Sequence, residues 1–72
     1  MKTYRLWYRS PYKECMMKVV DITANSLQSA ECSAKPHMFF ITDWPKINNG
    51  DSLEWVNPHN PEELYAITEL YQ

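Results

Sequence analysis

Two runs near the N-terminus alternate apolar and polar positions with the two-residue period of a β-strand. In residues 3–9 the two sides differ sharply in character, with Tyr4, Leu6 and Tyr8 on one side and Arg5, Trp7 and Arg9 on the other. Residues 15–23 are rich in β-branched side chains, which favour a strand. Pro11 lies between the two runs, where proline presets the backbone of a turn. The pattern predicts an antiparallel hairpin.

A short helix is predicted over residues 26–35. Asn25 as the N-cap and Gln28 at the third helical position fit a capping box. The apolar positions of this segment recur at helical spacing, and they are Leu27, Ala30 and Ala34. Pro36 disfavours further helix. A helix of this length needs packing to persist, and its small residues suit a position flat on a sheet.

The most apolar run of the chain, residues 37–42, predicts a central strand. The pair Asn49-Gly50 is typical of a type I′ hairpin turn, after which residues 52–56 return as a strand. Residues 62–72 fit two structures. Asn60 as an N-cap and Pro61 at the first helical position favour a helix, but the same stretch also fits an edge strand. We favour a helical turn over residues 61–64 that leads into a strand.

The predicted fold class is therefore α+β. We expect one small domain, residues 1–72, with an antiparallel sheet of three to five strands and one short helix packed on one face. The element order is β-β-α-β-β, with the C-terminal segment either helix or strand.

Length and composition exclude several functions. Gly50 is the only glycine among the 72 residues, so the chain lacks the clustered glycines of phosphate-binding loops. We expect no cofactor. The first ten residues carry Arg5 and Arg9 where a signal peptide needs an apolar core, so we expect a cytoplasmic protein that does not enter the membrane.

The side chains that could bind metal or act as nucleophiles form no recognisable motif. Cys15, Cys32, His37 and His59 lack the close spacing of a zinc site, and the two cysteines are interpreted as small buried hydrophobes. Cys32 and His37 are the one local nucleophile–base pair, at the end of a helix, and no serine elbow is present. We expect neither a metal site nor an enzyme.

Charge and aromatic content favour binding. Residues 1–18 carry five Lys or Arg against one acid, and residues 43–72 carry six acids against one lysine. Trp, Tyr and Arg are enriched at protein-binding hot spots. The predicted binding residues are accordingly Arg5, Trp7, Arg9, Tyr12, Trp44 and Trp55. Trp44 and Trp55 flank the second hairpin, where they either stack as part of the surface or fill the core. The opposite charges would also suit contacts between copies of the chain.

The stretch Tyr4-Arg5-Leu6-Trp7-Tyr8, followed by Val19-Val20-Asp21-Ile22 and by Ala24-Asn25-Ser26 with Ala30 and Ala34, resembles small accessory proteins of phages and prophages. The resemblance covers under half of the chain. It implies a non-enzymatic module that binds and modulates or inhibits a host protein. The alternative is a single-stranded nucleic-acid-binding protein that stacks bases on the Arg/Trp face, although a net charge of −2 argues against it.

Overall fold

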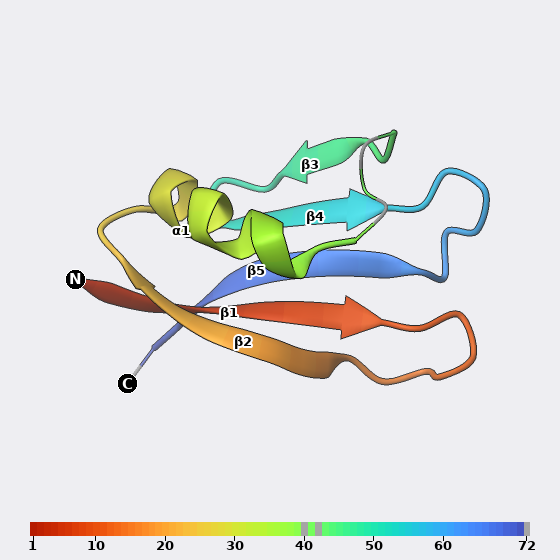
Figure 1. Cartoon of the computed structure of the whole chain (residues 1–72), viewed down its shortest axis with the longest axis horizontal. Helices are drawn as coiled ribbons and strands as arrows, with labels where there is room; N and C mark the ends of the chain where they lie inside the picture. Colours follow the sequence, from red (N-terminus) through yellow and green to blue (C-terminus); the bar gives the residue numbers. More distant parts are fainter. Residues whose placement is uncertain (40, 42, 72) are drawn as a thin grey trace.

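An antiparallel β-sheet with a helix on one of its faces is the framework of the protein (Figure 1). The computed structural model describes residues 1–39, 41 and 43–71, and within them five strands lie in the order β2-β1-β5-β4-β3. The elements in chain order are β1 (Lys2–Arg9), β2 (Met17–Ala24), α1 (Leu27–Ala34), the 3₁₀ turn η1 (Lys35–His37), β3 (Lys46–Asn48), β4 (Ser52–Val56) and β5 (Leu64–Leu70). The predicted α+β class is confirmed.

Strand β1 alternates as its sequence predicts. Tyr4 and Leu6 are buried under the helix, whereas Arg5 and Trp7 face the other side of the sheet and are partly exposed. The β1–β2 pairing is interrupted once by a β-bulge. Leu6 lies opposite Val20 and Trp7 lies opposite Lys18, so that Val19 is left between them without a partner in β1. The bulge brings Lys18 beside Trp7.

Helix α1 lies against the sheet through its two buried alanines. Ala30 and Ala34 are both 0 % exposed, because small side chains let the helix backbone approach the strands closely. The N-cap is Ser26 rather than the predicted Asn25, and its hydroxyl accepts a hydrogen bond from the backbone N–H of Ser29 at 3.2 Å. The predicted helix over residues 26–35 is confirmed, and it is one residue shorter at each end.

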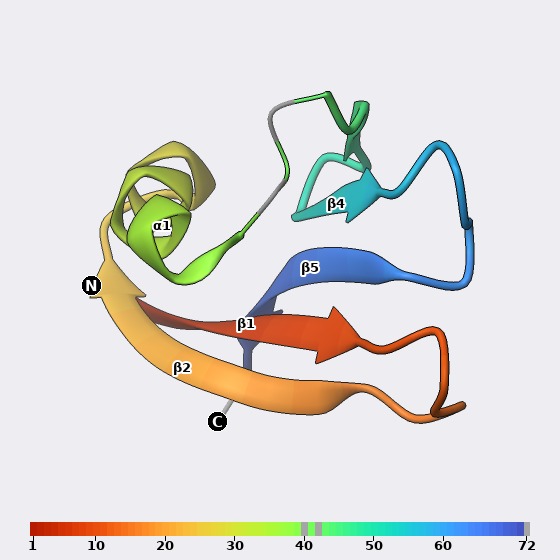
Figure 2. The same ribbon diagram turned by 45° about the vertical axis from the view of Figure 1, so that its right-hand side comes forward.

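The apolar run after Pro36 is not the central strand that its sequence predicts. His37 ends η1, and Met38, Phe39 and Ile41 lie outside strands; Phe40 and Thr42 of the predicted strand fall outside the described residues. Instead, the described residues Met38 and Ile41 lie on the same side of the sheet as α1 (Figure 2). Met38 is buried in the core at 6 % exposure. Ile41 packs against the same core, whereas Phe39 is 61 % exposed.

The central strand is β5, which the sequence favours only as an edge strand. It pairs with β1 on one side and β4 on the other, both antiparallel. The helical turn expected over residues 61–64 is wrong. Asn60 organises a turn there by accepting hydrogen bonds from the backbone N–H groups of Glu62, through its side chain, and Glu63, through its carbonyl. The same residue type favours both a helix start and a turn.

The β3–β4 hairpin is closed one residue later than predicted. The backbone N–H of Asn49 donates to the carbonyl of Ser52 at 2.9 Å, which places Gly50 and Asp51 at the central positions. Gly50 has a φ of +92°, as a glycine at the first central position of a type II′ turn does. The turn is confirmed in place, but its predicted type I′ register is wrong.

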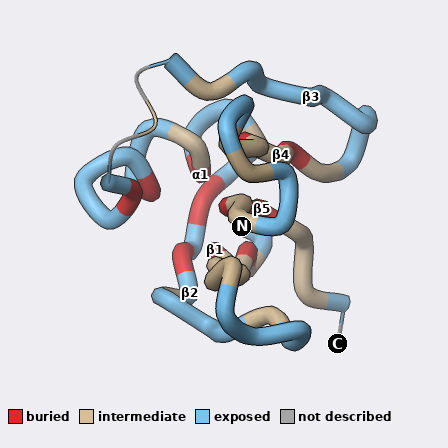
Figure 3. The backbone as a smooth tube through the Cα atoms, turned by 90° about the vertical axis from the view of Figure 1, so that its right-hand side faces the viewer, coloured by how far each residue is buried: buried red, intermediate tan, exposed pale blue. Residues whose placement is uncertain are grey.

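The core lies between the helix-covered face of the sheet and α1. Leu6 from β1 and Ile67 from β5 lie at its centre, both at 0 % exposure. Figure 3 shows buried stretches on α1 and on the strands beneath it, whereas β3 is exposed throughout. Because α1 covers one face only, the other face of the sheet remains uncovered by any described helix.

Candidate functional site

The face of the sheet opposite α1, here called the open face, is organised in rows that cross β1, β5 and β4. The strand register gives three such rows: Arg5–Thr68–Ser52, Trp7–Ala66–Glu54 and Arg9–Leu64–Val56. The predicted binding residues Arg5, Trp7 and Arg9 thus lie together on this face, as the alternation of β1 predicts. Trp7 occupies the middle row.

Trp7 is held in one position by its neighbours. Its indole Nε1–H donates to Oγ1 of Thr68 at 2.9 Å. The guanidinium carbon of Arg5 lies 5.3 Å from the ring centroid, within range of a cation–π interaction. Ala66, although its side chain belongs to the open face, is only 5 % exposed. With its polar atom already bonded, the indole offers an apolar, pre-positioned surface.

Arg5 is paired within the sheet. Its Nε and Nη2 donate to the two carboxylate oxygens of Asp21, at 2.7 and 3.1 Å, in a bidentate contact across β1 and β2. The hydrogen bond from Arg5 lowers the pKa of Asp21, and the same bond raises the pKa of Arg5. The Arg5 guanidinium is therefore largely occupied by this carboxylate.

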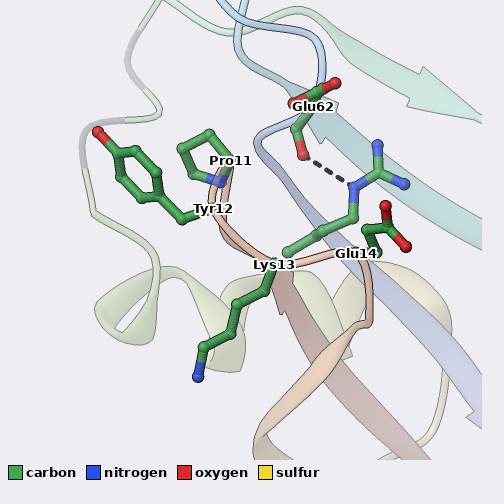
Figure 4. A pocket seen from close by; sticks show the side chains of 6 residues that line it. Pro11, Tyr12, Lys13, Glu14 and Glu62 are labelled. Atoms are coloured by element: carbon green, nitrogen blue, oxygen red, sulfur yellow. Dashed lines mark hydrogen bonds between the residues drawn. The ribbon is translucent and has the colours of Figure 1, made fainter.

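Arg9 joins two loops at one end of the sheet. Its Nε donates to the carbonyl of Glu62 at 2.8 Å, and Nη2 donates to the carbonyl of Pro61 at 3.4 Å. Figure 4 shows the first of these bonds at the shallow depression between the β1–β2 and β4–β5 loops. Tyr12, on the β1–β2 loop, points away from Glu62 and is 93 % exposed. Of the predicted binding residues, Tyr12 is thus fully available to solvent, on the loop that follows β1.

A hollow of about 450 Å³ lies on the open face. The residues that line it come from β1, β4, β5 and the end of the β1–β2 loop, and they are Trp7, Arg9, Met16, Glu54, Leu64, Ala66 and Thr68. Ala66 lies between Trp7 and Glu54 in one row, and its short side chain leaves space between the two larger ones. The lining is mostly apolar, which is typical of a binding site.

Trp44 and Trp55 lie on the other side of the sheet. Trp55 is 4 % exposed and belongs to the core cluster. Trp44 is partly buried, with its ring centroid 6.0 Å from that of Tyr65. The sequence left open whether these two side chains stack at the surface or fill the core. Trp55 fills the core, and Trp44 packs against it. We leave both out of the binding surface.

A hydrogen-bonded carboxylate fastens the β4–β5 loop to β1. Glu63 accepts a bond from the Tyr8 hydroxyl at 2.6 Å and another from Nδ2 of Asn57 at 2.8 Å. The hydrogen bond to Glu63, with a contribution from desolvation, raises the pKa of Tyr8 to about 12. The bond from Tyr8 thereby joins the β4–β5 loop to β1 at this end of the sheet.

The cysteines are not the buried hydrophobes that the sequence suggests. Cys15, before β2, and Cys32, on α1, are both exposed and carry no disulfide. A cysteine on a short amphipathic helix can fall on either face, and the narrow alanine face of α1 leaves Cys32 outside. Across residues 1–39, 41 and 43–71, no three His, Cys, Asp or Glu side chains are grouped so as to hold a metal ion.

Sequence reasoning missed the open-face residues of β4 and β5. The signal is present, since Tyr65 and Ile67 belong to the core cluster while the residues that alternate with them, such as Ala66 and Thr68, pair in the rows of the open face. It competes with a helical spacing of Leu64, Ile67 and Tyr71 in the same segment. The missed residues that line the hollow are Met16, before β2, and Glu54, Leu64, Ala66 and Thr68 on these two strands.

Comparison with known proteins gives no relative: no family model, curated protein or solved structure matches the chain. Within the part of the chain that the structure describes, α1 and every other helical segment is too short to span a membrane.

Proposed function

We propose that the protein is a non-enzymatic protein-binding module that modulates or inhibits a host protein, of the kind carried by phages and mobile elements, and that it acts in the cytoplasm. Its binding surface is the open face with the hollow beside Trp7, flanked by Arg5 and Arg9, with Tyr12 on the loop that follows β1. The observation that carries the proposal is the hollow itself, because a pre-positioned tryptophan beside an apolar depression on an uncovered sheet face is a typical anchor for a partner side chain.

The rigidity of the face supports this function. Three side chains of this face are bonded to other parts of the protein: Trp7 to Thr68, Arg5 to Asp21, and Arg9 to carbonyls of the β4–β5 loop. A partner therefore meets a surface that needs little ordering on binding, which lowers the entropic cost of association.

Single-stranded nucleic acid is the alternative ligand for the same face. Arg5, Trp7 and Arg9 share one side of β1, as a base-stacking platform requires. Against this ligand, Arg5 is already paired with a carboxylate and the chain has a net charge of −2. We therefore favour the protein partner.

The test begins by capturing proteins from an extract of the source cells on the immobilised protein, and by purifying each candidate for calorimetry. Trp7→Ala removes the anchor, and Ala66→Val fills the floor of the hollow while retaining Trp7. Both variants are expected to weaken binding by about tenfold or more, as loss of a hot-spot contact does. Tyr71→Ala, which removes an exposed ring outside the hollow, is the matched control and retains the wild-type affinity.

Circular dichroism and amide NMR spectra verify that each variant is folded. Wild-type affinity in both folded hollow variants would place the binding site elsewhere. In parallel, a thymidine oligonucleotide is titrated at low salt while tryptophan fluorescence is recorded. Quenching that weakens as salt increases and disappears in Trp7→Ala would replace the protein partner with nucleic acid.

A further inference from the structure

The chemistry of the hollow indicates which side chain it receives. Trp7 and Glu54 stand on either side of Ala66 in one row across three adjacent strands. Neighbouring strands lie about 4.8 Å apart, so the backbones of Trp7 and Glu54 are separated by roughly 10 Å. The space above Ala66 therefore suits one elongated side chain, with an indole on one side and a carboxylate on the other.

The two charged side chains that line the hollow differ in whether they already have hydrogen-bond partners. The carboxylate of Glu54, which is partly buried, has no hydrogen bond or ion pair to any described residue, and Glu54 is the one acid in the lining. Arg9, the one base in the lining, already donates to two loop carbonyls. An unpaired carboxylate beside an apolar wall is complementary to a cation on an aliphatic stem.

We propose that the hollow receives a lysine or arginine side chain of a partner protein, with its stem against Trp7 and Leu64 and its charged group paired with Glu54. This inference rests on the proposed function, because it assigns the chemistry of the partner at the same surface. The indole contributes a second attraction, since cations are drawn to the face of a tryptophan ring.

The test uses a display library of random twelve-residue peptides, selected against the wild-type protein and counter-selected against Ala66→Val. The enriched peptides are expected to share a Lys or Arg. Replacement of that residue by norleucine should weaken binding by about tenfold, the usual effect of losing a hydrogen bond to a charged group. Glu54→Gln should cause the same loss, and the two changes together should cost no more than either one alone.

Two further variants sharpen the result. Glu54→Lys should reverse the selection toward peptides with Asp or Glu at the shared position. Asp51→Asn, which also removes one acid but lies in the exposed β3–β4 turn outside the hollow, is the matched control and keeps the wild-type preference.

Each failure has a distinct meaning. Two outcomes would overturn this inference and leave the proposed function standing. In the first, the peptides bind the wild type and not Ala66→Val, but they share no basic residue. In the second, they bind Glu54→Gln as tightly as the wild type. A library that yields no hollow-dependent peptide would overturn both. Dimerisation of the protein that is abolished by Glu54→Gln in analytical ultracentrifugation would overturn the assignment to a partner, because the occupant would be a second copy.

Discussion

The Tyr8 hydroxyl provides a direct test of how the β4–β5 loop is fastened to β1. In Tyr8→Phe the hydroxyl is removed, while the ring remains to pack against Tyr65, 4.9 Å away between centroids. The bond that is lost is the 2.6 Å contact with the carboxylate of Glu63. We therefore expect a loss of stability that comes from one hydrogen bond and from little else.

The magnitude follows from the pKa of Tyr8. An increase from 10.0 to about 12 would correspond to roughly 2.7 kcal/mol if it were expressed fully. That figure includes the repulsion between an ionised Tyr8 and the Glu63 carboxylate, which is absent at pH 7, and the hydrogen bond of the neutral hydroxyl at this partly exposed position contributes about 1 kcal/mol. Hydrogen bonds to charged groups contribute about 1.5–3 kcal/mol when buried, which is consistent with a smaller value here. Tyr8→Phe should therefore lower the free energy of unfolding by about 1 kcal/mol at pH 7.

The pH dependence has a defined sign. Because the folded protein holds the Tyr8 proton more tightly than the unfolded chain, the contribution of this bond is complete below pH 10. It is lost as the pH increases from 10 to 12. Over that window the wild type should lose roughly 2.7 kcal/mol more than Tyr8→Phe, so that above pH 12 the wild type becomes the less stable of the two.

Urea unfolding followed by tryptophan fluorescence measures these differences, and absorbance at the tyrosinate band follows the titration itself. The wild type should contain one tyrosine, absent in Tyr8→Phe, that ionises near pH 12. Tyr12→Phe, at an exposed position, serves as the control for removal of a hydroxyl. Equal stability of Tyr8→Phe and wild type at pH 7, or a wild type whose tyrosines have all ionised by about pH 11, would refute the argument.

Two other predictions concern stability alone. Leu6→Ala removes a side chain at 0 % exposure, and the expected loss of about 2–5 kcal/mol approaches the whole stability of a domain this small, roughly 3–5 kcal/mol. Circular dichroism should show a largely unfolded chain, whereas a fully folded Leu6→Ala would contradict the core assignment; Val19→Ala, at an exposed bulge position, should change little. Gly50→Ala should cost about 1 kcal/mol in urea unfolding through backbone strain at φ +92°, since nothing lies within 4 Å of the added methyl group. Gly50→Asn should cost less because Asn tolerates this conformation, and a Gly50→Ala protein as stable as wild type would be the contrary result.

The sequence predicts local pattern better than strand order in this protein. The alternation of β1 assigns Tyr4 and Leu6 to the core and Arg5 and Trp7 to the opposite face, because a period of two depends only on neighbouring residues. The small-residue face of α1 is correct for the same reason.

The errors concern apolar segments whose role depends on distant parts of the chain. The run after Pro36 has the composition of a buried strand, yet its buried residue Met38 lies outside any strand, because burial in a strand and burial against a sheet both favour apolar side chains. Residues 64–70 satisfy both helix and strand periodicities, and pairing with β1 and β4 decides between them. The hollow forms only when β1, β5 and β4 lie side by side in that order, and the sequence pattern does not predict this strand order.

The position of β5 in the sheet also has a consequence for synthesis of the protein. The strand that joins the two halves of the sheet is the last of the five described strands to leave the ribosome. Until it emerges, β1 can pair only with β2 and β3 only with β4, and isolated two-stranded hairpins are marginally stable in water. The nascent chain therefore gains its sheet, and with it the Trp7 hollow, in one late step once β5 is released.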